Sequence, residues 1–304
     1  MIRFFYEIVR KQKSSERPYW KLAYKINKAL INFLFPLWQW QRRSRGIDEE
    51  SKIIVSLTTY PARIDSVWIT IASLLEQTMK PCKIILWLAE DEFSRHEIPK
   101  SLERQKKRGL EIRFCDDLKP HKKYYYTMQE YPEHYIITAD DDVFYPENHV
   151  ELLWMGYKKH PNAIICHWSH QIPIDRKGGF KLYNEWAIYK GDTPLYGTLA
   201  VGCNGVLYPP GSLPKETFAK EKIFEHSLYA DDLWLKCMEI LNGWKTINCN
   251  AVPLIYFSVL STKKSGLWKI NTGEASNNDI TWNKLMKLYP EVKSSLLEEK
   301  MNED

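Results

Sequence analysis

Residues 135–142 read Tyr-Ile-Ile-Thr-Ala-Asp-Asp-Asp, and this stretch decides the fold. Isoleucine and threonine favour a buried, pleated strand. Adjacent aspartates repel one another and are poor strand residues, so we expect the strand to end before Asp140. In an open α/β sheet the carboxyl ends of the strands form the ligand crevice. The three carboxylates of residues 140–142 should therefore stand at that crevice.

Asp140 and Asp142 are two residues apart, so in an extended segment both side chains point to the same side. Such a pair can share one hard divalent cation. Mg²⁺ and Mn²⁺ prefer oxygen ligands and often keep phosphate oxygens in their coordination shell. The stretch therefore suggests a metal–diphosphate site. A solvated acidic turn is the alternative, because acidic triplets are common in loops.

Short β-branched runs alternate with helical patterns along the rest of the chain, which predicts a parallel sheet with right-handed crossovers. Besides the central strand, we expect strands over residues 53–58, 83–89, 110–115, 163–166 and 201–208. We expect helices from about residue 65 and over residues 100–108, 124–130 and 148–159, another opening at residue 231, and a short one after residue 282. Residues 251–262 should be extended.

Four loops fall at expected carboxyl ends of strands: residues 58–63, 116–123, 140–142 and 202–205. They contain three cationic residues, Arg63, Lys122 and Lys123, which could neutralise the charge of a phosphate. They also supply the glycines Gly202 and Gly205, which allow a ligand or a neighbouring strand to approach the backbone closely. The alternatives are a surface arginine, a solvated basic patch and bulge glycines.

A second acidic centre follows at Asp231 and Asp232, where the start of a helix favours negative charge. A sugar hydroxyl that attacks an anomeric carbon needs a base to accept its proton, and a carboxylate commonly serves. The plainer interpretation is a charge pair at a helix N-terminus. The sequence has no Gly-x-Gly-x-x-Gly or Walker loop, so the common dinucleotide and P-loop sites lack their signature.

In this order the segments resemble the nucleotide-sugar glycosyltransferases of the GT-A fold, especially bacterial family-2-like enzymes of surface polysaccharide synthesis. The resemblance covers about residues 52–260. The segments that carry it are Val55 to Ile64, Asp117 with Lys122 and Lys123, Asp140 to Asp142, Gly202 to Pro209, and Asp231 to Leu233. It implies a GT-A-like α/β domain over residues 47–304 with Mn²⁺ or Mg²⁺ as cofactor.

The resemblance also implies roles for individual residues. The substrate-binding set would be Thr58, Tyr60, Arg63, Asp117, Lys122, Lys123, Asp140, Asp141, Gly202 and Gly205. Asp142 would coordinate the metal, with Asp141 as the alternative, and Asp140 would contact the ribose or serve as a second ligand. Asp232 would be the base of an inverting transfer, although Asp231 stands where Glu is more usual and leaves the choice within the pair open. The late ligand, often a histidine, would here be Asp279.

The basic residues gather in an N-terminal arm, residues 1–46. It holds eleven Lys or Arg against two Glu, a net charge of +9, and since the whole chain is +5 the remainder carries −4. Aromatic and aliphatic residues interleave with these cations, and the apolar run of about a dozen residues around Pro36 is short of the ~20 that a spanning helix needs. An interfacial helix on an anionic membrane surface fits this pattern. A helical extension packed on the body is the alternative.

We therefore expect a metal-dependent glycosyltransferase, cytoplasmic and peripheral on the inner face of the cell membrane. It would take a UDP- or GDP-sugar as donor and a glycan or lipid-linked acceptor. Its six cysteines, without a CxxC pair, indicate free thiols. A metal-dependent phosphoryl transferase or nuclease and a non-catalytic membrane-surface scaffold are the alternatives. The acidic body argues against nucleic acid as a partner.

Overall fold

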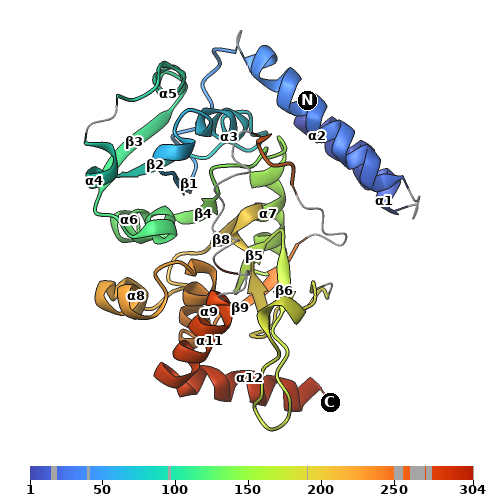
Figure 1. The fold of residues 1–304 in the computed structure, drawn as a ribbon, viewed down its shortest axis with the longest axis vertical. Helices are drawn as coiled ribbons and strands as arrows, with labels where there is room; N and C mark the ends of the chain where they lie inside the picture. Colours follow the sequence, from blue (N-terminus) through green and yellow to red (C-terminus); the bar gives the residue numbers. More distant parts are fainter. Residues whose placement is uncertain are drawn as a thin grey trace.

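The computed structural model describes residues 1–14, 19–39, 42–94, 97–189, 191–249, 256–260, 271 and 276–303. Its centre is a mixed sheet in the order β3-β2-β1-β4-β8-β5-β9 (Figure 1). The strands are β1 (Ile53–Thr58), β2 (Lys83–Ala89), β3 (Leu110–Cys115), β4 (Tyr135–Ala139), β5 (Ala163–Cys166), β8 (Val206–Tyr208) and β9 (Lys245–Asn248). Only β8 runs antiparallel to its neighbours β4 and β5. The expected mostly parallel α/β sheet is confirmed.

Helices flank this sheet, and a two-stranded ribbon of β6 (Ser169–Gln171) and β7 (Thr198–Ala200) stands beside it (Figure 1). The helices before β8 are α3 (Val67–Leu74), α4 (Glu90–Phe93), α5 (Lys100–Lys106), α6 (Lys122–Glu130) and α7 (His149–Lys159). Those after it are α8 (Lys220–His226), α9 (Asp231–Leu241), α11 (Asn277–Leu288) and α12 (Pro290–Glu303). In the described part of the chain, no helix combines the length and apolar character that a membrane crossing requires.

The structure corrects two expected elements. The strand expected over residues 201–208 begins only at Val206, because Gly202–Asn204 is a single 3₁₀ turn and Gly205 has a positive φ of 86° that breaks the extended run. The chain ends in two helices, α11 and α12, where we expected one short helix. The helix expected from about residue 65 is present and starts at Val67. Residues 251–255 and 261–262 of the expected extended segment lie outside the described residues.

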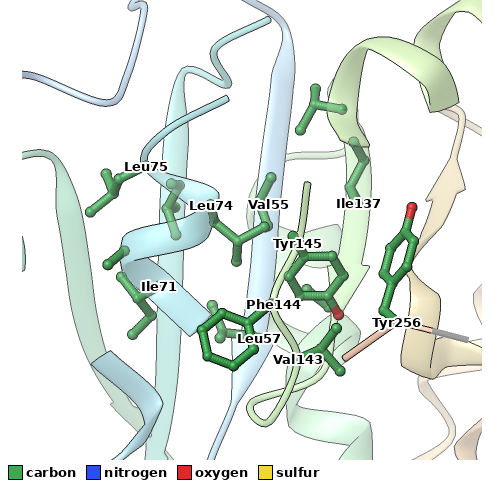
Figure 2. Close-up of a cluster of buried hydrophobic side chains, with 14 of the residues drawn as sticks. Val55, Leu57, Ile71, Leu74, Leu75, Ile137, Val143, Phe144, Tyr145 and Tyr256 are labelled. Carbon is green, nitrogen blue, oxygen red and sulfur yellow. The ribbon is translucent and has the colours of Figure 1, made fainter. Parts of the chain in front are cut away.

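The main hydrophobic core lies between β1, β4 and helix α3. β1 and β4 are consecutive in the sheet and parallel, so both of their faces are covered and their runs read as continuously apolar. Val55 of β1 lies beside Leu74 of α3, Ile137 of β4 belongs to the same cluster, and Phe144 follows just beyond the triple aspartate (Figure 2). The core therefore fixes the exit of β4, from which residues 140–142 leave the sheet.

The basic arm forms two helices, α1 (Ile2–Ser14) and α2 (Trp20–Gln39), which lie together along one side of the molecule (Figure 1). Pro36 interrupts the apolar run in the sequence but lies inside α2 without ending it. The inner faces of both helices belong to the main core through Ile2, Phe5, Tyr6, Val9, Ile31 and Phe35. The alternative of an extension packed on the body is thus correct for the inner face of the arm.

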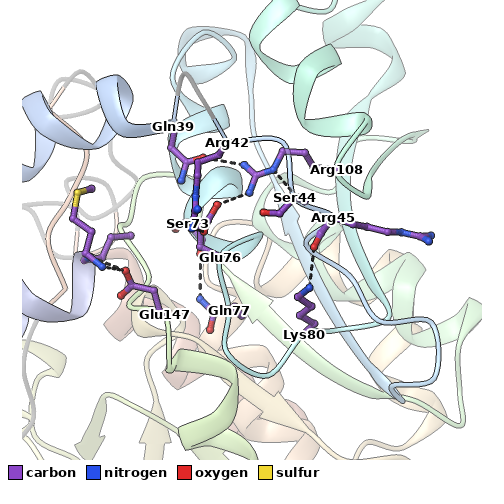
Figure 3. A network of polar contacts seen from close by, with 12 residues as sticks. Gln39, Arg42, Ser44, Arg45, Ser73, Glu76, Gln77, Lys80, Arg108 and Glu147 are labelled. Atoms are coloured by element: carbon purple, nitrogen blue, oxygen red, sulfur yellow. Dashed lines mark hydrogen bonds and ion pairs between the residues drawn. The ribbon is translucent and has the colours of Figure 1, made fainter.

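Polar contacts hold both ends of the arm (Figure 3). At its beginning, the carboxylate of Glu147 accepts hydrogen bonds from the backbone N–H groups of Ile2 (2.8 Å) and Arg3 (2.7 Å), the orphan donors of helix α1. At its end, buried Arg108 donates to the side chain of Gln39 (2.9 Å) and to the carbonyl of Ser44 (3.1 Å). The arm is therefore a fixed part of the fold.

Phe35→Ala should show that the arm belongs to the core. Phe35 is fully buried and packs edge-on against Phe144 at 5.5 Å between ring centroids. Removing a buried phenylalanine ring should lower the free energy of unfolding by about 3–5 kcal/mol. The control is Phe33→Ala on the same helix, which is 67% exposed and should change it by less than about 0.5 kcal/mol. Equal effects in urea unfolding would show that the arm is not packed as described.

Candidate active site

The loops predicted from the sequence to form the site all lie at one edge of the sheet. β1, β3 and β4 run in the same direction, so the segments that follow Thr58, Cys115 and Ala139 emerge together. β8 runs the opposite way and pairs Val206 with Thr138, which brings the Gly202–Asn204 turn to that same edge. Helix α9 then begins with Asp231 beside this turn.

Asp141 is held inside the protein by Arg63 and Thr59. One carboxylate oxygen is paired with the guanidinium of Arg63, and the other accepts a hydrogen bond of 2.6 Å from the hydroxyl of Thr59. Burial raises the pKa of Asp141 while the charge of Arg63 opposes that rise. Arg63 is itself buried, so a surface arginine, the alternative suggested by the sequence, is wrong. Asp141 thus fixes the loop from β1 to the loop from β4.

Lys123 joins the two acidic centres. Its ammonium nitrogen lies 2.9 Å from a carboxylate oxygen of Asp140 and 2.8 Å from one of Asp231. Burial favours its neutral form, but the charges of Asp140 and Asp231 hold its pKa well above the ordinary value. Lys122 turns elsewhere and pairs with Asp117. Both lysines are buried, so the solvated basic patch considered from the sequence is wrong.

The neighbouring carboxylates of Asp231 and Asp232 are in different states. The pKa of Asp231, although burial would raise it, is lowered by the charge of Lys123. The pKa of Asp232 is raised to about 8, by burial and then by the charge of Asp231. Both oxygens of Asp232 lie 3.2 Å from the backbone nitrogen of Gly202. A carboxylate with a pKa near neutrality suits a general base, so the difference in pKa would favour Asp232 over Asp231 for that role.

Two glycines allow this packing. A Cβ atom at Gly202 would stand 2.9 Å from an oxygen of Asp232 and 3.0 Å from the ammonium of Lys123. At Gly205 it would stand 2.5 Å from the buried ring of His149, on a backbone whose φ of 86° disfavours other residues. The close backbone approach expected at these positions is therefore to the protein's own side chains.

Asp142 and Asp140 offer the oxygen donors that a hard divalent cation prefers. Burial, followed by the charge of Asp141, raises the pKa of Asp142 to about 7, and a cation beside it would relieve that cost. Within the described ranges no group of three or more His, Cys, Asp or Glu has the arrangement of a metal cage. Mg²⁺ commonly binds through one or two carboxylates together with substrate phosphates, so a two-carboxylate site fits it.

The other residues predicted for the site have contacts of their own, separate from those of Lys123. Thr58 donates to the carbonyl of Trp87 (2.9 Å), and the Tyr60 ring lies 5.3 Å from the guanidinium of Arg63. Asp117 accepts from the backbone of Lys119 (2.9 Å) and pairs with lysines of its own loop. Asp279 accepts a hydrogen bond of 2.7 Å from the backbone of Tyr183, and in the described part of the structure no contact links it to Asp142.

Sequence reasoning missed Lys28, a residue of the arm. It donates to the hydroxyl of Ser258, and its charge is one of the influences that lower the pKa of Asp142. The backbone nitrogen of Val259 donates to the carbonyl of Asp142 (2.7 Å), so this segment lies against the acidic loop. The only signal in the sequence was the i, i+4 spacing of Tyr24, Lys28 and Asn32, which places three polar groups on one side of α2.

A cavity of about 440 Å³ lies at the opposite edge of the sheet, next to the start of β4 and the end of β8. Its lining includes Tyr131, His134, Tyr208 and Ser212 and none of the acidic residues described above. The candidate site is therefore identified by its charges and hydrogen bonds, and not by cavity volume.

No family model and no curated protein match this chain. Among solved structures, the mannosyltransferase PcManGT from Pyrobaculum calidifontis in complex with GDP-Man and Mn²⁺ is 14% identical, with a TM-score of 0.49 over 92% of this chain and 78% of that one. S. aureus TarS, residues 1–349, is 12% identical, with a TM-score of 0.39 over 77% and 70% of the two chains. At these values neither likeness assigns a family or an activity to this chain.

Arg63→Met should destabilise the protein by about 3–5 kcal/mol, because it leaves the buried Asp141 carboxylate unpaired. The double variant Arg63→Met/Asp141→Asn should regain a large part of that loss, since the buried charge is then gone. Arg45→Met is the matched control, because its ion pair with Glu49 is on the surface and is worth about 0–1 kcal/mol. Urea unfolding measures all three, and additive losses in the double variant would contradict a buried pair.

Proposed function

We propose that this chain is a metal-dependent glycosyltransferase. It moves a sugar from a nucleoside-diphosphate sugar, UDP- or GDP-linked, to a glycan or lipid-linked acceptor with inversion at the anomeric carbon. The observation that carries the proposal is the position of Lys123 between Asp140 and Asp231. Asp140 belongs to the centre suited to a metal-bound diphosphate, and Asp231 is next to the residue suited to act as general base. Lys123 contacts both and so keeps the two centres close together, as sugar transfer requires.

The donor would lie across the carboxyl edge of the sheet. Thr58 and Tyr60 stand at the end of β1, where they can contact the base and ribose. Asp142 and Asp140 would hold the divalent ion, Mn²⁺ or Mg²⁺, which as a Lewis acid neutralises the charge of the leaving diphosphate. Arg63 lies 3.2 Å from Asp142 and adds fixed positive charge there. Asp117, Lys122 and Asp141 support these groups through their ion pairs and do not face the substrate in this proposal.

The acceptor reacts at Asp232. The acceptor hydroxyl oxygen attacks the anomeric carbon and forms the new C–O bond as the bond to the diphosphate oxygen breaks. The hydroxyl proton passes to the Asp232 carboxylate, whose raised pKa of about 8 suits proton capture. Asp231 stays ionised on Lys123 and fixes the first turn of α9. A single displacement of this kind inverts the configuration at the anomeric carbon.

The cellular setting we propose is the inner face of the cell membrane, in the synthesis of surface polysaccharide. Support comes from the charge of the chain, +9 over residues 1–46 against −4 over the rest. A basic segment is attracted to anionic lipid, and an acidic body keeps away from it. The arm, residues 1–46, would thus orient the domain of residues 47–304 toward lipid-linked acceptors.

Thermal unfolding with a panel of nucleoside diphosphates, each with and without Mn²⁺, tests the donor site. One diphosphate should raise the melting temperature only when the metal is present, because the metal and the diphosphate complete each other's ligands. Asp142→Asn should abolish that shift and the transfer while keeping the fold. Asp232→Asn should keep the shift and lose the transfer. Stabilisation by Ca²⁺ alone, with none from any diphosphate, would support the scaffold alternative instead.

The rate of transfer should depend on pH through Asp232. Its raised pKa means that the carboxyl group is protonated, and inactive as a base, below about pH 8, and ionised above it. kcat/KM should therefore rise with pH and level off above about pH 8, since this quantity reports the free enzyme. A profile that is flat between about pH 6 and about pH 9 would remove Asp232 from the role of base.

A further inference from the structure

Helix α2 has apolar side chains on both of its sides. One side is buried against the body through Ile31 and Phe35. The other carries an outer stripe, which we define as Leu22, Ile26, Leu30, Phe33, Leu34 and Leu37, each between 38% and 67% exposed. These positions recur every three or four residues, so they form one continuous face along the helix. A surface helix of a globular protein normally presents polar residues there, so this face requires a partner.

Helix α1 extends this stripe. Its Phe4 is 64% exposed, and α1 packs along α2. Exposed cations accompany the apolar groups, namely Arg10 and Lys11 of α1 and Lys21 and Lys25 of α2. An apolar face edged by lysine and arginine is complementary to a surface whose interior is hydrocarbon and whose outer layer is anionic. A dimer formed through this face would instead place two basic arms against each other, and their like charges would repel.

We propose that the outer stripe of α2, with Phe4, inserts into the interface of an anionic lipid bilayer, with the helix parallel to the bilayer surface. The apolar side chains enter the boundary between headgroups and acyl chains, and the basic side chains lie at the lipid phosphates. This inference rests on the proposed function only for the identity of the acceptor, because the docking face is argued from its own residues.

The same helix connects the membrane to the candidate active site. On the side opposite the stripe, the hydroxyl of Tyr24 donates to the carbonyl of Tyr256 (3.2 Å), and Asn32 accepts from the backbone nitrogen of Leu260 (2.8 Å). The segment 256–260 held in this way contacts Asp142 through the Val259 N–H. An α-helix with its side chains is about 10–12 Å across. Docking would therefore place the acidic loop about one helix diameter above the lipid headgroups.

This geometry defines the acceptor more closely. A sugar carried directly on a lipid phosphate reaches such a site without leaving the membrane surface, whereas a free soluble glycan gains nothing from the docked position. We therefore infer that the acceptor is attached to a lipid and reacts within a short distance of its headgroup.

Flotation with phospholipid vesicles tests the docking face on the full chain. Wild-type protein should float with vesicles of phosphatidylcholine and phosphatidylglycerol and much less with phosphatidylcholine alone. Phe33→Glu/Leu37→Glu should weaken binding by about a hundred-fold or more, because burying each of these two side chains is worth at least about a factor of ten. Phe224→Glu on α8, where Phe224 is 48% exposed, is the matched control and should bind like wild type. Thermal unfolding verifies that each variant is folded.

Two results would overturn the proposal. One is wild-type protein that does not float with anionic vesicles. The other is a stripe variant that binds as tightly as the control. Light scattering separates a dimer interface from a membrane face, because a dimer dissociated by Phe33→Glu/Leu37→Glu without any vesicle binding would assign the stripe to a second copy. The nucleotide-induced thermal shift of the stripe variant should remain as in wild type, so failure of docking is distinguishable from failure of the donor site.

Discussion

The candidate site depends on one buried ammonium group. Lys123 lies between Asp140, which follows β4, and Asp231, which opens α9, and its charge offsets the repulsion of carboxylates that would otherwise not stand so close. A buried charge is tolerated only when it is paired, so the carboxylates hold the pKa of Lys123 well above its ordinary value, and the charge of Lys123 lowers the pKa of Asp231. Asp232 makes no ion pair with Lys123 of the kind Asp231 has, and burial, followed by the charge of Asp231, raises its pKa. The two adjacent aspartates thus differ because only one of them is paired directly with the lysine.

The sequence was sufficient to predict the parts of the fold that follow from local pattern. Continuous apolar runs identified β1, β2, β4 and β5, because strands buried on both faces have no alternation that could be misassigned. β3 was also predicted, although it is the edge strand and its run is interrupted by Glu111 and Arg113. It was less successful near Gly202, where a strand was expected but the backbone makes a 3₁₀ turn and donates to Asp232. The glycines at 202 and 205 were noticed, but the partner of this turn lies thirty positions away and could not be read from the local pattern.

For the site, the sequence identified the chemical groups but not their pairing. It suggested Arg63, Lys122 and Lys123 as interchangeable cations for a phosphate, yet each is committed to a different carboxylate in the structure. Two consecutive lysines at the start of α6 point in directions about 100° apart around the helix, and small differences in register decide which one reaches Asp140. The role of Lys28 was not predicted, because the arm was interpreted as an interfacial helix or as an extension of the body. In the structure, the inner face of helix α2 belongs to the core.

The short strand β8 has a mechanical consequence. Among the strands that the structure describes, it is the only antiparallel member of the central sheet, and it joins the half made of β3, β2, β1 and β4 to the half made of β5 and β9. Three residue pairs connect it to β4 and two connect it to β5, so this seam is the narrowest part of the sheet. Asp140 and Asp142 follow β4 of the first half, and the turn that leads into β8 donates to Asp232. Within the function proposed above, a local opening of the sheet at β8 would therefore change the separation of the leaving group and the base.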